Sequence, residues 1–298
     1  MKDIGGTVTK TFRETFKLVQ KDTLRWFPGH MDKGRQADFR HTLTGLKPHI
    51  FVLNKIDLAD LKYKQQIEST LKNEGLSHIL FTNFKNQDCK GMKKILPLAK
   101  ELISNSERYN RSNEESFAMM IIGVPNVGKS SLINRLRNTY LKKSKATKEG
   151  PIAGVTRSVL TRIKIAENPD FYLLDTPGIL APHVKDIYTG LKLALIGCLQ
   201  DHLVGHIVVA DFLLFCLNKY GKYEYVEKLG LSEPNDDIIF ILTFIAAKLG
   251  KTLKLRDCTN KYIIKPDMQV AATYFINMFR NGEFGPICLD EDKLFNEN

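Results

Sequence analysis

A glycine-rich run in the middle of the chain constrains the fold most. Residues 123–131 read G-V-P-N-V-G-K-S-S, which contains the G-x-x-x-x-G-K-S pattern of a phosphate-binding loop. The apolar run Phe117–Ile122 precedes it and predicts a buried strand, while residues 132–136 have the apolar spacing of a helix. Because such loops work between a strand and a helix, this context indicates an α/β domain that binds phosphate groups.

Each position of this loop has an expected role. Gly123 and Gly128 let the backbone wrap closely around phosphate oxygens, and the N–H groups at the helix start point inward. Lys129 supplies a positive charge to the terminal phosphates, and Ser130 offers its hydroxyl to Mg²⁺. The nucleotide contacts expected here are Asn126, Val127, Gly128, Lys129, Ser130 and Ser131.

A second motif, upstream, predicts which base is bound. Asn54-Lys-Ile-Asp57 has the form N-K-x-D and follows the apolar run Ile50–Leu53. The Asp57 carboxylate would accept both N–H groups of the guanine edge, which adenine lacks, so we expect GTP. Ile79–Asn83 predicts a neighbouring strand that ends behind the base. The base contacts expected are Asn54, Lys55, Ile56, Asp57, Thr82 and Asn83.

Two further segments complete the expected nucleotide site. Residues 171–178 read F-Y-L-L-D-T-P-G, a strand that ends in D-T-P-G. Asp175 would hold Mg²⁺ through water, and the Gly178 N–H would contact the γ-phosphate. Thr156, in the run G-V-T-R, lies between the two phosphate motifs, where a switch residue is expected. The predicted Mg²⁺ ligands are therefore Ser130, Thr156 and Asp175.

The order of these motifs is unusual. An ordinary GTPase has the phosphate loop first and N-K-x-D last, whereas here N-K-x-D comes first, which indicates a circular permutation. Residues 26–31 read W-F-P-G-H-M, and residues 189–194 read T-G-L-K-L-A. With the permuted order, they make the chain resemble the circularly permuted ribosome-assembly GTPases over nearly its whole length. The resemblance is strongest to the mitochondrial ribosome-associated GTPase 1 family, relatives of the bacterial ribosome biogenesis GTPase A.

This resemblance implies a GTP-binding and hydrolysing factor in assembly of the large mitochondrial ribosomal subunit, with ribosomal RNA as its partner. It places the protein in the mitochondrial matrix or peripherally on the inner membrane, with the cytoplasm as the alternative. Two other functions remain open. The chain could be a GTP-dependent switch that acts on protein partners, or an assembly factor that binds nucleotide without hydrolysing it.

The motifs leave catalysis unassigned. Ile179 follows D-T-P-G where many GTPases have a glutamine that orients the attacking water, so we expect slow hydrolysis that rises on the ribosome. Asn126 suggests one supplement, because GTPases with this asparagine often bind K⁺ beside the phosphates. The alternative is that Asn126 only shapes the loop.

Charge favours a polyanionic partner. Lys and Arg number 44 against 33 Asp and Glu, a net charge of +11. Basic residues gather at 142–148 and again at Lys248, Lys251, Lys254 and Arg256. Each cluster alone is more typical of a solvated surface, but together they favour RNA. No apolar run approaches the roughly 20 residues of a membrane span, so no transmembrane segment is expected.

Domain organisation follows from the periodicity. We expect an N-terminal segment at 1–30, a three-layer, mostly parallel α/β GTPase domain at 31–182 and a small helical domain at 186–298. Helices are expected at 188–203, 206–219, 238–249 and 270–279. The cysteines are scattered singly, which fits a reducing compartment. His202 and His206 lie four apart, but with no third ligand nearby we do not expect a zinc site.

One departure from the family affects the whole sheet. Family members place a strand ending in Asp-Ala-Arg-x-Pro between P-G-H-M and N-K-x-D, whereas residues 32–49 are mostly polar here. That strand belongs beside the phosphate-loop strand. Either the chain lacks this segment, which would leave an incomplete sheet that folds and binds GTP poorly, or the region is rebuilt in a way that the sequence does not show. The segment around Phe12, Phe16 and Val19 predicts instead a basic amphipathic helix, either a mitochondrial presequence or a surface for the ribosome or a membrane.

Overall fold

The chain folds into two compact units, which are described separately. The first comprises Met1–Pro182 with Asp290–Asn298, and the second His183–Leu289. The sequence instead assigned everything from 186 to 298 to the helical domain. The computed structural model describes residues 15–22 (backbone only), 48–73, 75–86, 88–105, 116–142, 161–175, 186–256 and 260–291.

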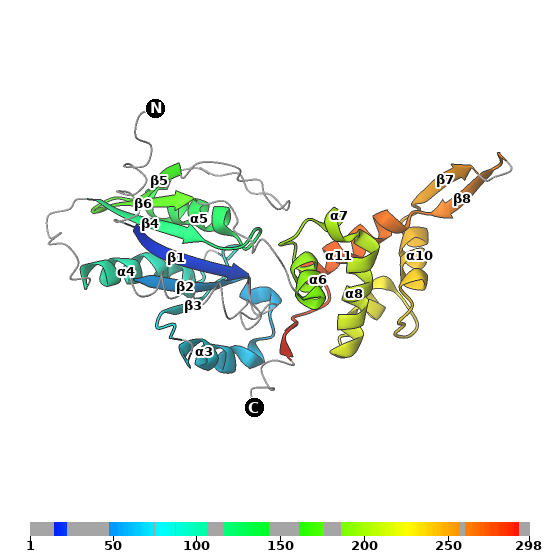
Figure 1. Ribbon diagram of the computed structural model, residues 1–298, viewed down its shortest axis with the longest axis horizontal. Coiled ribbons are helices and arrows are strands. Elements are labelled where there is room, and N and C mark those ends of the chain that lie inside the picture. The colour runs from blue at the N-terminus through cyan, green and yellow to red at the C-terminus, as the bar shows by residue number, and fades with distance from the viewer. Residues whose placement is uncertain are drawn as a thin grey trace. The chain divides into compact units, whose positions relative to one another are not determined.

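The first unit contains a six-stranded sheet with the order β3-β2-β1-β4-β6-β5 (Figure 1). Its neighbouring strands are parallel, except that β5 runs antiparallel to β6. This confirms the mostly parallel α/β class. The strands are β1 Thr15–Asp22, β2 His49–Asn54, β3 Ile79–Phe81, β4 Ser116–Ile122, β5 Thr161–Ala166 and β6 Asp170–Asp175.

Both faces of the sheet are covered, which explains the unbroken apolar runs in its strands. Successive side chains point to opposite faces, yet Ile50, Phe51, Val52 and Leu53 of β2 are all buried. Ile50 and Val52 belong to the core that also contains buried side chains of α4 and α5. The helical elements of this unit are the 3₁₀ turns η2 Ile56–Leu58 and η3 Leu61–Tyr63, and the helices α3 Lys64–Asn73, α4 Lys90–Ser104 and α5 Lys129–Leu141.

The position of the expected missing strand is occupied, so the prediction of an incomplete sheet is wrong. The N-terminal strand β1 pairs in parallel with β2 over Lys17–Asp22 and with β4 over Thr15–Val19. A segment predicted as an amphipathic helix therefore joins the strands that lead into N-K-x-D and the phosphate loop. Inserting a further strand at this point would compete with β1 rather than fill a gap.

The second unit is helical, as the sequence predicted, but with different boundaries. The helix expected at 188–203 ends at Leu195, before Gly197, whose φ of +79° is in the region that favours glycine. The helix over His206–Lys219 was predicted with these bounds. Neither α9 nor the hairpin of β7 and β8 was expected. The elements are α6 Ile187–Leu195, α7 Asp201–Val204, α8 His206–Lys219, α9 Glu224–Leu229, α10 Ile238–Lys248, β7 Thr252–Arg256, β8 Tyr262–Pro266 and α11 Met268–Asn281.

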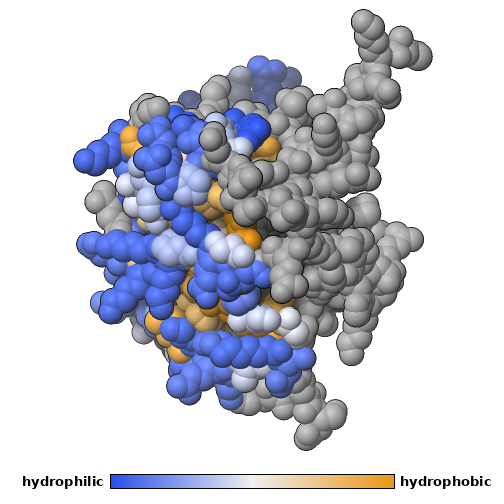
Figure 2. Space-filling view, turned by 90° about the vertical axis from the view of Figure 1, so that its left-hand side faces the viewer, coloured by the Kyte–Doolittle hydropathy of each residue, from blue (hydrophilic) through white to orange (hydrophobic). Residues whose placement is uncertain are grey.

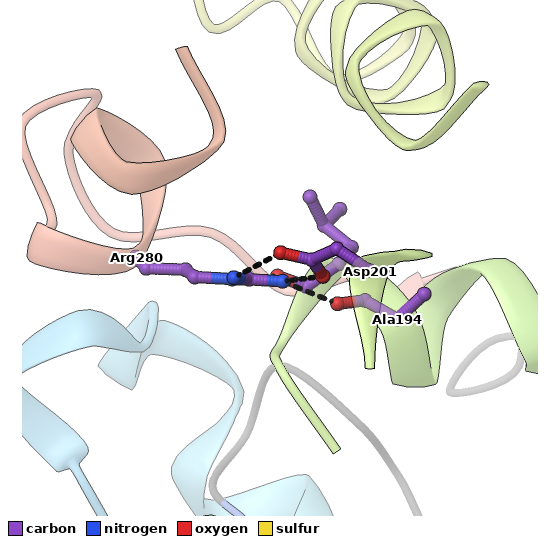
Figure 3. A network of polar contacts seen from close by, with 4 residues as sticks. Ala194, Asp201 and Arg280 are labelled. Carbon is purple, nitrogen blue, oxygen red and sulfur yellow. Dashed lines mark hydrogen bonds and ion pairs between the residues drawn. The ribbon is translucent and has the colours of Figure 1, made fainter. Parts of the chain in front are cut away.

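A bidentate ion pair holds the last helix of this unit against the first two (Figure 3). The Arg280 guanidinium on α11 donates to both carboxylate oxygens of Asp201 on α7, at 2.8 and 2.5 Å. The same group donates to the carbonyls of Ala194 at 2.7 Å and Leu195 at 3.0 Å. Ala194 ends the T-G-L-K-L-A run, so this run supplies one of the two C-terminal carbonyls of α6 to which Arg280 donates, and Leu195 supplies the other.

The described residues also bear on the sequence expectations for the surface, for membrane spans, for metal ligands and for the cysteines. Hydrophilic side chains cover most of the described surface on the face shown in Figure 2. Within the described ranges, no helix combines the length and apolarity that crossing a membrane requires. Nor do the described His, Cys, Asp and Glu residues form any group of three or more that could hold a metal, and His202 and His206 are no exception. Cys89, Cys198, Cys216 and Cys288 are buried free thiols.

Candidate nucleotide-binding site

The phosphate loop lies at the carboxyl end of β4, in the strand, loop and helix order that the motif requires. β4 ends at Ile122, and α5 begins at Lys129. Gly128 precedes the helix with φ +100°, and Asn126 has φ +59°. Gly128 therefore adopts a conformation that side chains disfavour, and the loop brings backbone groups toward the N-terminus of α5, a site suited to anions.

Lys129 lies inside the loop that it is predicted to serve. Its side chain is 8% exposed, and its Nζ donates to the carbonyls of Gly123 at 3.0 Å and Val124 at 2.8 Å. The ammonium group is thus held across the mouth of the loop from the first turn of α5. A positive charge in this position favours bound phosphate oxygens.

Asp175 brings a buried carboxylate to the same place. It ends β6, the neighbour of β4, and is 5% exposed. Burial raises its pKa, while the nearby Lys129 charge acts in the opposite direction. Its Oδ1 is buried and has no hydrogen-bond partner among the described residues. An unsatisfied carboxylate oxygen is a suitable ligand for a hard cation, so this donor fits the predicted Mg²⁺.

Asn54 connects the base motif to the phosphate loop. Its Nδ2 donates to the Val127 carbonyl at 3.0 Å, across 73 positions of sequence. Its Oδ1 accepts from the Phe84 N–H at 3.2 Å and from the Thr82 hydroxyl at 3.5 Å. Asn54 was predicted to brace the N-K-x-D loop. The structure shows that one buried amide also positions the phosphate loop and the segment after β3.

The other residues predicted to contact the base lie close to Asn54. Lys55 has a left-handed backbone, with φ +60° and ψ +40°, and the following Ile56 N–H donates to the Thr82 carbonyl at 3.2 Å. Asp57 is exposed in η2, where its carboxylate is open to a ligand. Thr82 is fully buried, and the Asn83 Oδ1 accepts from the Lys85 N–H at 2.9 Å. The two predicted base segments therefore meet at the end of the sheet.

Sequence reasoning missed two residues that support this region. The Arg135 guanidinium on α5 donates to the carbonyls of Phe84, at 3.1 and 2.9 Å, and of Lys85, at 2.9 Å. At Gly91 on α4, a Cβ atom would lie 1.9 Å from the Phe81 carbonyl oxygen, so only glycine lets the helix approach β3 so closely. Neither belongs to a motif, and only the folded chain places them here.

Some predicted site residues lie outside the described ranges. They are Thr156, Gly178 and Ile179, together with the W-F-P-G-H-M run at 26–31. The described residues thus bring together the phosphate loop, the base motif and Asp175. The roles expected for Thr156 and Gly178 stay predictions.

Comparisons with known proteins agree with this arrangement. A family model described as "50S ribosome-binding GTPase" matches residues 118–244. Mitochondrial GTPase 1 of Aedes aegypti is 46% identical, over 96% of this chain and all of the relative. Mitochondrial ribosome-associated GTPase 1 of Bos taurus is 44% identical, over 98% of this chain and 96% of the relative. GNP-bound YlqF from T. maritima has a TM-score of 0.52 at 19% identity, covering 95% of this chain and 96% of that structure, which shows a shared fold.

Proposed function

Because the chain belongs to the mitochondrial ribosome-associated GTPase 1 family, we propose that it binds and hydrolyses GTP during assembly of the large mitochondrial ribosomal subunit. The observation that carries this proposal is the bond from the Asn54 amide to the Val127 carbonyl. It ties a guanine-reading motif to a phosphate loop that follows it in the sequence. A domain that holds these two motifs together can bind both the base and the phosphates of one guanine nucleotide.

The side chains of the predicted site divide the work of nucleotide binding. Lys129 neutralises charge on the terminal phosphates, and Asp57 reads the guanine edge. Mg²⁺ would be held by Ser130 and Asp175, together with Thr156, and when bound it would supply positive charge to the phosphate oxygens. The buried Asp175 Oδ1, which has no hydrogen-bond partner among the described residues, supports this role. A cation beside it would favour the ionised carboxylate, which burial alone disfavours because it raises the pKa.

Substituting Asp57 tests the base assignment. Asp57→Asn replaces one of the two carboxylate acceptors with an N–H₂ donor, which opposes a guanine N–H and matches the carbonyl that xanthine has there. We expect GTP affinity to fall at least tenfold, about 1.4 kcal/mol, and XTP affinity to rise. Titration with fluorescent GTP and XTP analogues measures both.

The matched control is Asp88→Asn, which removes the same charge from an exposed side chain. It should leave both affinities unchanged. If the Asp57 variant kept the parent's preference for GTP over XTP and ATP, the base assignment would be wrong.

We propose that Asn126 supports a K⁺ ion beside the phosphates, where the ion would offset negative charge that develops during hydrolysis. Its φ of +59° holds it in the phosphate loop next to Val127. Hydrolysis should therefore be several times faster in KCl than in NaCl at equal ionic strength, as measured by phosphate release. Asn126→Asp keeps the shape of the residue and serves as the comparison. Equal rates of the parent in the two salts would leave Asn126 with a purely structural role.

The proposed setting is the mitochondrion, in the matrix or peripherally on the inner membrane. Ribosomal RNA is the proposed partner, which the net charge of +11 supports because neutralising phosphates favours binding. A GTP-dependent switch on protein partners is the competing function. Such a switch would bind its protein partners in a nucleotide-dependent way, and neither ribosomes nor the salt concentration would change this binding.

A further inference from the structure

Packing within the second unit does not account for the hairpin of β7 and β8. All ten of its strand residues are exposed. In Figure 1 it extends beyond the helices α10 and α11 that flank it in sequence. A two-stranded hairpin gains little stability by itself, and exposed leucine, isoleucine and tyrosine side chains favour contact with a partner.

The register sorts the side chains of the hairpin onto two faces. Residues directly opposite each other in an antiparallel pair share a face, and alternate residues along a strand do so too. One face therefore carries Thr252, Lys254, Arg256, Tyr262, Ile264 and Pro266, and we call it the cationic face. The other carries Leu253, Leu255, Ile263 and Lys265. Tyr262 and Ile264 on the cationic face are 65% and 64% exposed, against 39–46% for the three aliphatic residues opposite.

Arg256 and Tyr262 form a prearranged pair on the cationic face. They are opposite each other in the register. The guanidinium lies 5.2 Å from the centre of the Tyr262 ring, and its Nη2 donates to the Tyr262 hydroxyl at 3.1 Å. A planar cation held beside an exposed aromatic ring combines the two groups that proteins use to stack on unpaired bases and to contact phosphates.

The positive charge of the hairpin also favours a polyanionic partner. Residues 251–266 contain five Lys or Arg residues and one acidic residue, Asp257. The sequence grouped Lys248 with these residues. Its Nζ donates instead to the Leu229 carbonyl at 2.8 Å, so we do not count it among the cations of the hairpin. The cations that line the hairpin are Lys251, Lys254, Arg256, Lys261 and Lys265.

A membrane surface fits this pattern less well than a nucleic acid does. Each face of the hairpin carries a cation among its apolar side chains: Lys254 and Arg256 on one, and Lys265 on the other. Inserting either face into a bilayer would take a charge out of water, which is costly. A nucleic acid, by contrast, would engage both groups: its phosphates would contact the cations, and its bases would stack on the Tyr262 ring.

We propose that the β7–β8 hairpin is an RNA-binding arm. Lys254 and Arg256 contact phosphates, and the exposed Tyr262 ring stacks on an unpaired base of single-stranded or looped RNA. This inference rests on the proposed function, because it names the surface that would hold the RNA partner.

The test uses the full chain and large-subunit mitochondrial ribosomal RNA transcribed in vitro, with binding measured by filter retention at several KCl concentrations. Lys254→Gln with Arg256→Gln removes the two cations that are proposed to contact phosphates. We expect affinity to fall about tenfold and the salt dependence to decrease by about 1.5 in slope, since each lost phosphate contact removes roughly 0.7–0.9. Tyr262→Ala should weaken binding about tenfold with little change in slope.

The matched control is Lys90→Gln with Lys94→Gln, two exposed lysines of α4 in the first unit. An equal loss of affinity in the control would mean that overall charge alone attracts RNA, and would overturn the proposal. Flotation with phosphatidylcholine–cardiolipin vesicles tests the membrane alternative, and a hairpin variant that lost vesicle binding but kept RNA binding would also overturn it.

Failure of this inference can be told apart from failure of the proposed function. If the parent binds the RNA and both hairpin variants bind it equally well, the hairpin assignment alone fails. If the parent binds GTP but shows no affinity for the RNA at any salt concentration, the proposed RNA partner fails as well. Circular dichroism and GTP titration of each variant establish that the rest of the chain is folded.

Discussion

Replacing Lys129 with alanine should lower the affinity for GTP about a hundredfold. The ammonium is buried and held against the Gly123 and Val124 carbonyls, so it is already positioned for the phosphates. Charge-assisted hydrogen bonds are worth about 1.5–3 kcal/mol each, and losing contact with two phosphates makes about 3 kcal/mol a reasonable expectation. Titration with a fluorescent GTP analogue in the presence of Mg²⁺ measures the loss.

The control for this experiment is Lys94→Ala, which removes the same charge from an exposed position on α4. It should bind GTP as the parent does. Thermal unfolding of both variants separates loss of binding from loss of fold. A folded Lys129 variant with the parent's affinity would contradict the phosphate-loop assignment.

A proline in β1 should destabilise the first unit and weaken GTP binding together. Leu18 pairs with Ile50 on β2 and with Ile121 on β4, so β1 is a central strand. Proline has no N–H to donate to a neighbouring strand, and Leu18→Pro should cost about 3 kcal/mol or more. In a domain of this size that corresponds to a fall in melting temperature of about 6–12 °C.

GTP affinity should fall with stability, because β1 lies between the strands that carry N-K-x-D and the phosphate loop. Leu18→Ile keeps the backbone N–H and a strand-favouring side chain, and it should resemble the parent in both measurements. If the proline variant melted and bound GTP as the parent does, the sheet would not depend on β1, and the strand order reported above would be wrong.

The nucleotide motifs could be found from sequence because each is a short, contiguous piece of chemistry. The run from Gly123 to Ser131 carries its own glycines, lysine and hydroxyls, and the apolar residues before it can only be a buried strand in that context. The permuted motif order is likewise a property of the linear chain. The helix His206–Lys219 could be predicted because its apolar spacing and the glycine before it are local signals.

Other features depend on contacts between distant residues, and the sequence alone did not determine them. Residues 15–22 contain Phe16, Leu18 and Val19 among polar residues, a spacing that a helix face and a strand accommodate almost equally well. The segment forms a strand because it lies between β2 and β4, whose backbone N–H and C=O groups must be paired on the sides that face it. The Asn54 bond to Val127, the Arg135 contacts and the exposed β7–β8 hairpin likewise exist only after folding. Sequence therefore determined the chemistry of the site, whereas tertiary structure decided which segment completes the sheet beneath it, since strand pairing is set by non-local neighbours.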